Sequence, residues 1–198
     1  AGDILVTVDQ EICGICRLHD LAPSFPSRDS IVSMDSEEME SLAASMANAA
    51  KDMGINCFLA PILDVVTGDN PWLLNRTWST YPAQIGRVSA AFIRGLQANG
   101  VAATAKHFPG DGVDCRDQHL ITSVNSLSKE EWMATFGEIY RARFKEGVHA
   151  VMTGHIALPW LDKTVGRGGR PRPGTVSPDI MTKLLRDELG FEGVVVSD

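Results

Sequence analysis

Three observations predict an α/β fold with a parallel sheet for this chain of 198 residues. Apolar, β-rich runs alternate with helical segments at a period of roughly 45 residues. The runs are almost continuously apolar, as expected for parallel strands whose two faces are both covered by helices. Each run also ends in charged or titratable residues, and in such folds the strand ends lie at the edge of the sheet where ligands bind.

Capping residues mark the ends of the helical segments. Acidic residues begin the first segment, and Ser128 followed by Glu131 predicts a capping box at the start of the third. A glycine follows every segment, as is typical of helix C-termini. The expected elements are strand 4–8, helix 36–53, strand 57–66, helix 83–99, strand 101–108, helix 128–146, strand 148–155, helix 179–189 and strand 193–197.

Two architectures accommodate this order, an open doubly wound sheet and a (β/α)8 barrel of the TIM type. A complete barrel typically needs roughly 250 residues and eight strand–helix units. The length would suit a small open sheet, but the sequence ends on the last expected strand, at Asp198, with no helix to cover it. We therefore expect residues 1–198 to form one partial domain, a truncated barrel with about five strands and four helices.

The composition excludes several classes of partner. The chain has 18 Lys and Arg against 25 Asp and Glu, a net charge of −7, so neither nucleic acid nor an anionic membrane surface is an expected partner. No apolar run approaches the roughly 18 residues of a membrane span, and no secretory leader is seen. The 4 cysteines are too few for a disulfide scaffold, so a soluble, cytoplasmic protein is expected.

Side chains suited to catalysis follow two of the expected strands. Lys106 and His107 leave a strand into a turn with Pro109 and two glycines, where a cation and an imidazole can meet a hydroxyl-rich ligand. Asp198, at the tip of a buried strand, has the chemistry of a carboxylate nucleophile for an acetal carbon. The alternative for Asp198 is an N-cap of a following helix, and the spacing alone does not separate the two.

Asp117 and His119 form a second constellation, in the stretch between an expected strand and helix. On extended backbone, residues two apart point to the same side, and a carboxylate there can orient an imidazole for general acid/base catalysis. Taken alone, an Asp-x-His pair is more often a pair of surface residues on a long loop.

Together these motifs resemble the catalytic barrel of family 3 glycoside hydrolases, and within it the β-N-acetylhexosaminidase branch. The resemblance covers nearly the whole chain. It rests on VDQE at 8–11, AKHFPGDG at 105–112, DQH at 117–119, VMTGHIALP at 151–159 and LGFEGVVVSD at 189–198.

The resemblance implies a retaining exo-glycosidase that hydrolyses terminal β-linked N-acetylhexosamine (GlcNAc) from small glycans, as in peptidoglycan recycling. It implies that Asp198 is the nucleophile and that His119, paired with Asp117, is the general acid/base. It also implies that sugar hydroxyls in the −1 subsite are bound by Asp9, Arg76, Lys106 and His107. No metal or organic cofactor is expected, because the carboxylate and the imidazole supply both nucleophile and proton.

The sequence departs from the family pattern in three places. Glu11 continues as EICGICR where the family has EGGRV, Arg76 is followed by Thr77-Trp78, and Asp111 replaces the histidine of the usual FPGHG. Measured against the family's barrel, the first strand–helix unit and everything after the nucleophile strand are expected to be missing. The alternatives are a family 3 β-glucosidase, a glycoside phosphorylase, or a non-catalytic carbohydrate-binding remnant.

Overall fold

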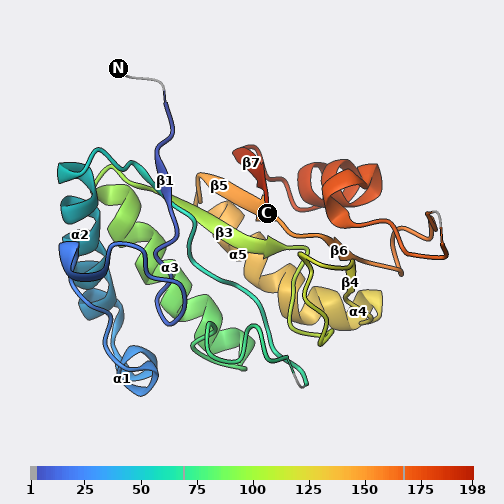
Figure 1. The fold of residues 1–198 in the computed structure, drawn as a ribbon, viewed down its shortest axis with the longest axis horizontal. Helices are drawn as coiled ribbons and strands as arrows, with labels where there is room; N and C mark the ends of the chain where they lie inside the picture. The colour runs from blue at the N-terminus through green and yellow to red at the C-terminus, as the bar shows by residue number, and fades with distance from the viewer. Residues whose placement is uncertain (1–3, 69, 167) are drawn as a thin grey trace.

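A five-stranded parallel sheet, in the order β1-β2-β3-β5-β7, forms the centre of the computed structural model (Figure 1). The structure describes residues 4–68, 70–166 and 168–198. Its elements are β1 (Thr7–Val8), η1 (His19–Leu21), α1 (Arg28–Ser33), α2 (Ser36–Asp52), β2 (Cys57–Phe58), α3 (Pro82–Ala98), β3 (Ala102–Phe108), β4 (Ser123–Val124), α4 (Lys129–Trp132), η2 (Met133–Gly137), α5 (Glu138–Lys145), β5 (Ala150–Thr153), β6 (Ile156–Ala157), η3 (Gly174–Val176), η4 (Asp179–Glu188) and β7 (Val194–Ser197).

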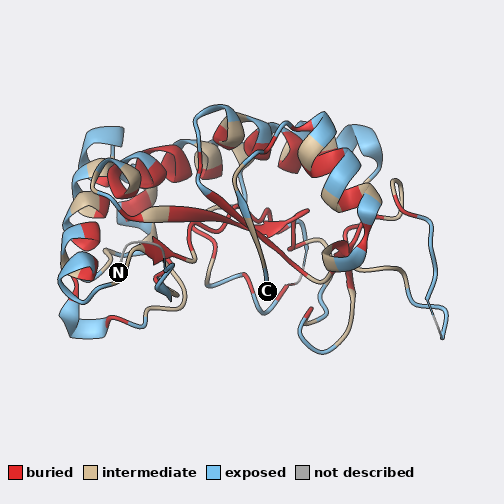
Figure 2. Cartoon of the chain, turned by 90° about the horizontal axis from the view of Figure 1, so that it is seen from above, coloured by how far each residue is buried: buried red, intermediate tan, exposed pale blue. Residues whose placement is uncertain are grey.

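The helices line one side of the sheet. Figure 2 shows them as an arc along the upper edge of the view, with the buried strands beneath and loops on the opposite side. Helix α3 packs against β3, α5 and α2. This curved, parallel arrangement is part of a (β/α)8 barrel, so the predicted fold class is confirmed.

The core lies between the sheet and the helices, and aromatic side chains fill its middle. Phe108, at the end of β3, is fully buried and meets Trp132 and Tyr140 edge to face, with ring centroids 6.4 and 5.1 Å apart. Such edge-to-face pairs add roughly 0.5–1.5 kcal/mol to the free energy of burial. They fix the end of β3 against the helix layer, and this is the strand end that carries Lys106 and His107.

The predicted capping signals are confirmed. Ser128 accepts from the backbone N–H of Glu131, and the Glu131 carboxylate accepts from the Ser128 N–H at 2.8 Å. A second capping box, between Asp35 and Glu38, begins α2. Each glycine expected to end a helix has a positive φ, between 72° and 82°, at positions 54, 100, 147 and 190.

Several predicted boundaries are wrong. The expected strand 57–66 pairs only at Cys57–Phe58, partly because Pro61 has no N–H to donate to a sheet; the chain then continues extended, with one bridge between Ile62 and Lys106. The expected helix 128–146 consists of α4, the π-helical η2 and α5 in succession. Helix α1 and the two-stranded sheet of β4 and β6 were not predicted.

Among the described residues, no helix is both long enough and apolar enough to span a bilayer.

Candidate active site

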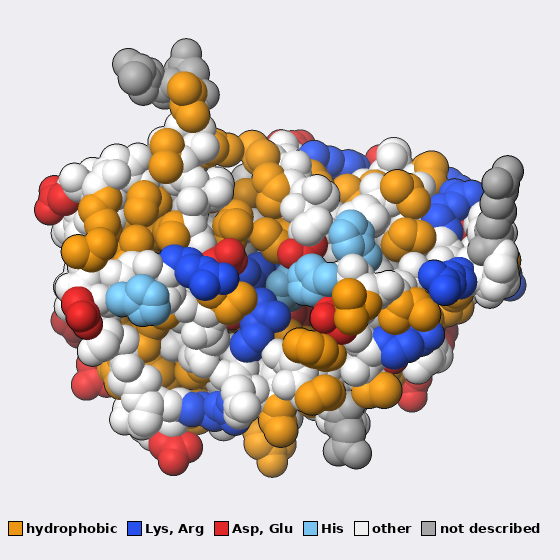
Figure 3. Space-filling model, in the orientation of Figure 1, with side chains coloured by type: hydrophobic (Ala, Val, Ile, Leu, Met, Phe, Trp, Pro, Cys, Tyr) orange, Lys and Arg blue, Asp and Glu red, His pale blue; other side chains and the backbone are white. Residues whose placement is uncertain are grey.

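The carboxyl ends of the strands bring the predicted site residues together at one edge of the sheet. Asp9 follows β1, Lys106 and His107 lie at the end of β3, and Asp198 follows β7. In Figure 3, histidine, acidic and basic side chains gather near the centre of the face that carries the tip of β3. These residues are far apart in the sequence, and the parallel sheet brings them close together in space.

Lys106 is a buried cation held between two carboxylates. Its side chain is 2% exposed, and Nζ lies 3.0 Å from Asp9 Oδ1 and 2.8 Å from Glu11 Oε1. The guanidinium of Arg76 binds both oxygens of Glu11, with Nε to Oε2 at 3.0 Å and Nη2 to Oε1 at 2.6 Å. Burial acts to raise the pKa of Glu11, but the hydrogen bond from Arg76 and the charges of Lys106 and Arg76 outweigh it and lower the pKa to about 2. Glu11 is therefore ionised at neutral pH and fixes both cations.

His107 is oriented by a second buried carboxylate, Asp64. Asp64 Oδ2 lies 2.6 Å from His107 Nδ1, and Asp64 Oδ1 accepts from the backbone N–H groups of His107 at 3.2 Å and Asp111 at 2.8 Å. Both side chains are at most 2% exposed. Because Nδ1 is engaged, Nε2 is the ring atom of His107 that faces the site.

The turn after β3 packs too closely for side chains at its two glycines. A Cβ at Gly110 (φ 116°) would lie 2.3 Å from the ring of Phe136, and one at Gly112 (φ 107°) would lie 2.6 Å from the carbonyl oxygen of Val65. Trp132 Nε1 also donates to the carbonyl of Pro109 at 2.7 Å. The turn is thus held against the helix layer and the chain after β2.

The predicted Asp117–His119 pair is formed, but its backbone is a turn and not the extended chain expected. Asp117 Oδ1 accepts from the backbone N–H of His119 at 3.0 Å and lies 2.6 Å from its Nδ1. An aspartate that bonds its own backbone two residues on stabilises such a turn. These bonds, the backbone one first, lower the pKa of Asp117. The imidazole of His119 is 55% exposed.

Asp198 lies between two imidazoles. Its Oδ2 is 3.7 Å from His119 Nε2 and 3.8 Å from His107 Nε2, and it makes no hydrogen bond to any described residue. The carboxylate is 16% exposed, and the backbone N–H of Asp198 donates to the carbonyl of Thr153 at 3.0 Å. The backbone of Asp198 is thus held by β5, whereas its Oδ2 has no hydrogen-bond partner among the described residues.

The unusual EICGIC loop, residues 11–16, helps to hold the side chain of Glu11 in place. The loop forms a narrow hairpin. The Glu11 N–H donates to the Ile15 carbonyl at 2.7 Å, and Gln10 and Cys16 pair in an isolated antiparallel β-bridge. The Ile15 N–H also donates to Glu11 Oε2 at 2.9 Å. A Cβ at Gly14 would lie 2.1 Å from that same oxygen, so a side chain there would displace the Glu11 carboxylate from its position.

All seven predicted site residues therefore reach this edge of the sheet, though Arg76 does so through Glu11. Sequence reasoning left Glu11 and Asp64 out of the site. Both occupy strand-end positions that the sequence had marked as acidic. The sequence does not show that Glu11 and Asp64 are buried and paired, because their partners are far away along the chain.

Comparison with known proteins shows which family the chain is related to. A β-N-acetylglucosaminidase/β-glucosidase of Cellulomonas fimi is 44% identical over 160 residues, which are 79% of this chain and 28% of that protein. The solved family 3 β-N-acetylglucosaminidase of Paenibacillus sp. str. FPU-7 superposes with a TM-score of 0.90 at 31% identity, over 98% of this chain and 36% of that one.

The solved β-glucoside phosphorylase BglX has a TM-score of 0.82 at 36% identity and covers 89% of this chain and 33% of its own. The chain thus spans about a third or less of the length of each of these three proteins. Residues 3–198 match the model of the glycosyl hydrolase family 3 N-terminal domain, and the chain belongs to that family.

Proposed function

We propose that residues 1–198 are part of the catalytic barrel of a retaining exo-glycosidase that releases terminal β-linked N-acetylhexosamine. The observation that carries this proposal is the placement of Asp198 Oδ2, 3.7 Å from the Nε2 of an exposed imidazole whose Nδ1 is held by a carboxylate. A nucleophile and a proton donor are the two groups that glycoside hydrolysis with retention requires.

In the first step, protonated His119 gives the proton on Nε2 to the glycosidic oxygen as the bond from that oxygen to the anomeric carbon breaks. A carboxylate oxygen of Asp198 attacks the anomeric carbon and forms a covalent glycosyl-enzyme. In the second step, neutral His119 takes a proton from water, the oxygen of that water bonds to the anomeric carbon, and the bond to Asp198 breaks. Asp117, bonded to Nδ1, keeps Nε2 as the exchanging atom in both steps.

The distance between the two groups favours retention over inversion. Inverting enzymes separate their two carboxyl groups by roughly 6.5–9.5 Å to admit a water, whereas retaining enzymes separate them by roughly 5–5.5 Å. His119 and Asp198 are 3.7 Å apart, closer than either. This short separation leaves no space for the additional water that inversion requires.

Three side chains that the fold holds in place would bind the sugar. Lys106, His107 and Arg76 are fixed before any ligand arrives, so hydroxyl groups meet donors that need no reorganisation. The preference for an N-acetylhexosamine rests on the named activity of the C. fimi and Paenibacillus relatives.

Trapping the covalent intermediate tests the proposal. In the full-length protein, His119→Ala with 2,4-dinitrophenyl β-GlcNAc is expected to accumulate a peptide that carries GlcNAc on Asp198, seen by mass spectrometry, because deglycosylation lacks its base. His149→Ala, an exposed histidine at the start of β5, is the matched control and should accumulate none. Binding of GlcNAc with no turnover by the wild-type protein would instead identify a carbohydrate-binding remnant.

Phosphorolysis is the second candidate, favoured by the similarity to the phosphorylase BglX. After it gives up its proton His119 is neutral, so it would not repel a phosphate dianion as a carboxylate base would. Turnover of GlcNAc and glucose substrates with and without inorganic phosphate separates these activities. A sugar 1-phosphate as the main product would show that the reaction is phosphorolysis and not hydrolysis. A preference for glucosides would show that the substrate sugar is glucose and not N-acetylhexosamine.

A further inference from the structure

We propose that Asp111 and Gln118 form a positioning pair that fixes the acid/base turn to the sheet and so holds His119 opposite Asp198. This inference rests on the function proposed above for His119. Asp111 stands where the family pattern has a histidine, and Gln118 lies between the two members of the dyad. Neither residue has a role in the proposed chemistry.

Gln118 is the buried residue of the turn. It is 5% exposed, whereas the His119 side chain next to it is 55% exposed. Its Nε2 donates to Asp111 Oδ2 at 3.2 Å, and its Oε1 accepts from the backbone N–H of His155 at 2.6 Å. A Cβ at Gly154 would lie 2.4 Å from that Oε1, so the amide sits directly on the backbone after β5. One side chain thus connects the turn to two strand ends.

The carboxylate of Asp111 acts only as a hydrogen-bond acceptor. Its Oδ1 accepts from the backbone N–H of Gly112 at 2.8 Å and from Ser123 Oγ at 3.4 Å, while Oδ2 accepts from Gln118. Its own backbone N–H donates to Asp64 Oδ1, the carboxylate that orients His107. A series of hydrogen bonds therefore runs from His107 through Asp64, Asp111 and Gln118 to the backbone N–H of His155, and Gln118 precedes His119 directly in the chain.

The partners also fix which way the amide of Gln118 points. An ionised carboxylate can only accept and the His155 N–H can only donate, so the amide nitrogen must face Asp111 and the amide oxygen must face His155. An Asn side chain at 111 cannot accept on both sides. When its oxygen meets the Gly112 N–H, its NH₂ faces the NH₂ of Gln118, and one of the two contacts of the amide is lost.

The charge state of Asp111 matches this requirement. Burial raises the pKa of Asp111 to about 6, and the charge of Asp64 acts in the same direction, while His107 and the hydrogen bonds from Gly112 and Ser123 oppose the rise. Tyr140 on α5 faces the same carboxylates, and its own pKa is raised by burial and by their charges. Asp111 is therefore mostly ionised at pH 7, the state in which it accepts from Gln118.

The test compares two substrates in the full-length protein. Gln118→Met removes both contacts of the amide at similar volume. We expect kcat/KM for a GlcNAc disaccharide, a poor leaving group that needs the proton, to fall on the order of 10²-fold, because misplacing a catalytic group by about 1 Å costs that much. With a 2,4-dinitrophenyl leaving group, which needs no acid, the loss in the glycosylation step should be small. Asp111→Asn should show the same pattern.

Gln97→Met is the matched control. Gln97 also bridges two backbone groups, donating to the Gly147 carbonyl at 3.0 Å and accepting from the His149 N–H at 3.0 Å, but at the other end of the sheet. This variant should lower stability in the way Gln118→Met does, with the ratio of kcat/KM for the two substrates unchanged. A purely structural role for Gln118 would give the same unchanged ratio.

A double variant shows whether Gln118 acts through His119. In the His119→Ala background, Gln118→Met is expected to cause no further loss on the disaccharide. An additive loss in the double variant would overturn the positioning role. So would an equal loss on both substrates in both Gln118→Met and Asp111→Asn. Neither result would contradict the proposed function of His119. If His119→Ala itself showed no dependence on the leaving group, the proposed function would fail, and this inference with it.

Discussion

Two parts of the site are built in opposite ways. The strand-end cluster of Glu11, Lys106, Asp64 and His107 is buried, and each member is held by an ion pair or a hydrogen bond to another member. The turn of Asp117 and His119 is exposed and is joined to the sheet through the single buried amide of Gln118. The two parts are therefore held differently: the groups that would bind a sugar are fixed by their buried partners, whereas the exposed group that would move a proton is held through a neighbouring residue.

Removing the imidazole on the turn should have the largest effect on activity and almost none on stability. For His119→Ala we expect kcat/KM on the disaccharide to fall about 10²–10⁴-fold, the range of general acid/base catalysis. The free energy of unfolding should stay within about 0.5 kcal/mol of wild type, since the side chain is exposed. Urea denaturation beside initial rates measures both, and His149→Ala should change neither. A large loss of stability in His119→Ala would contradict the view that this imidazole, unlike the buried cluster, adds little to the stability of the fold.

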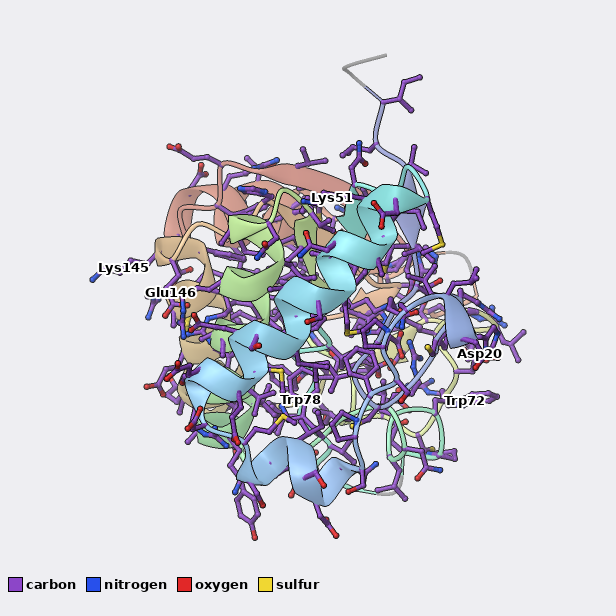
Figure 4. All side chains as sticks on the ribbon, turned by 90° about the vertical axis from the view of Figure 1, so that its left-hand side faces the viewer. Asp20, Lys51, Trp72, Trp78, Lys145 and Glu146 are labelled. Atoms are coloured by element: carbon purple, nitrogen blue, oxygen red, sulfur yellow. The ribbon has the colours of Figure 1, made fainter. Side chains whose placement is uncertain are left out.

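The reverse pattern is expected in the cluster. Lys106→Met keeps the volume but leaves Asp9 without its cation and Glu11 with Arg76 alone, and breaking a buried ion pair from one side costs about 3–5 kcal/mol. The free energy of unfolding should fall by that amount, together with activity. Lys51→Met, on the exposed end of α2 (Figure 4), is the control and should change stability by under about 0.5 kcal/mol. An equally small change in Lys106→Met would show that the cluster is not fixed by its charges.

Acid should weaken the cluster through Glu11. The pKa of Glu11 is lowered from an ordinary value of 4.5 to about 2 in the folded protein, so the folded state binds its proton less readily than the unfolded state. The stabilisation is complete above pH 4.5 and is lost as the pH falls from 4.5 to 2. At 1.36 kcal/mol per pKa unit it amounts to about 3 kcal/mol. The free energy of unfolding of Glu11→Gln, measured over this range, should lack that part of the acid dependence; a slope equal to that of wild type would contradict the assignment.

The sequence predicted the site residues Lys106 and His107, but not the buried carboxylates that hold them. Strands buried on both faces leave continuous apolar runs, and the residue that ends each run is then visible, as for Asp9 and Lys106. The pairing of Glu11 with Arg76 joins residues 65 positions apart, and no local pattern records it. The two-residue strands β4 and β6 were missed for the related reason that such short strands show no period.

The pairing of Asp117 with His119 was predicted from spacing, but with the wrong backbone conformation. Alternation along an extended chain placed Asp117 and His119 on one side, whereas the structure places them together through a turn that the Asp117 carboxylate stabilises. The buried role of Gln118 was not visible, because a glutamine between two charged residues is equally typical of a solvated loop. Its partner Asp111 was noted only as a departure from the family pattern.

Ser123 gives the smallest test, at the junction of the two parts. Its hydroxyl donates to Asp111 and acts to lower the pKa of that carboxyl, so Ser123→Ala should raise the pKa above about 6. Because a raised carboxyl pKa costs stability only where the folded state would otherwise be ionised, the variant should lose about 1 kcal/mol at pH 7 and less at pH 4. Urea denaturation at the two pH values measures this, with the exposed Ser126→Ala as control. An equal loss at both values would mean that Ser123 only fills space, and that Asp111 is held by its backbone and by Gln118 without it.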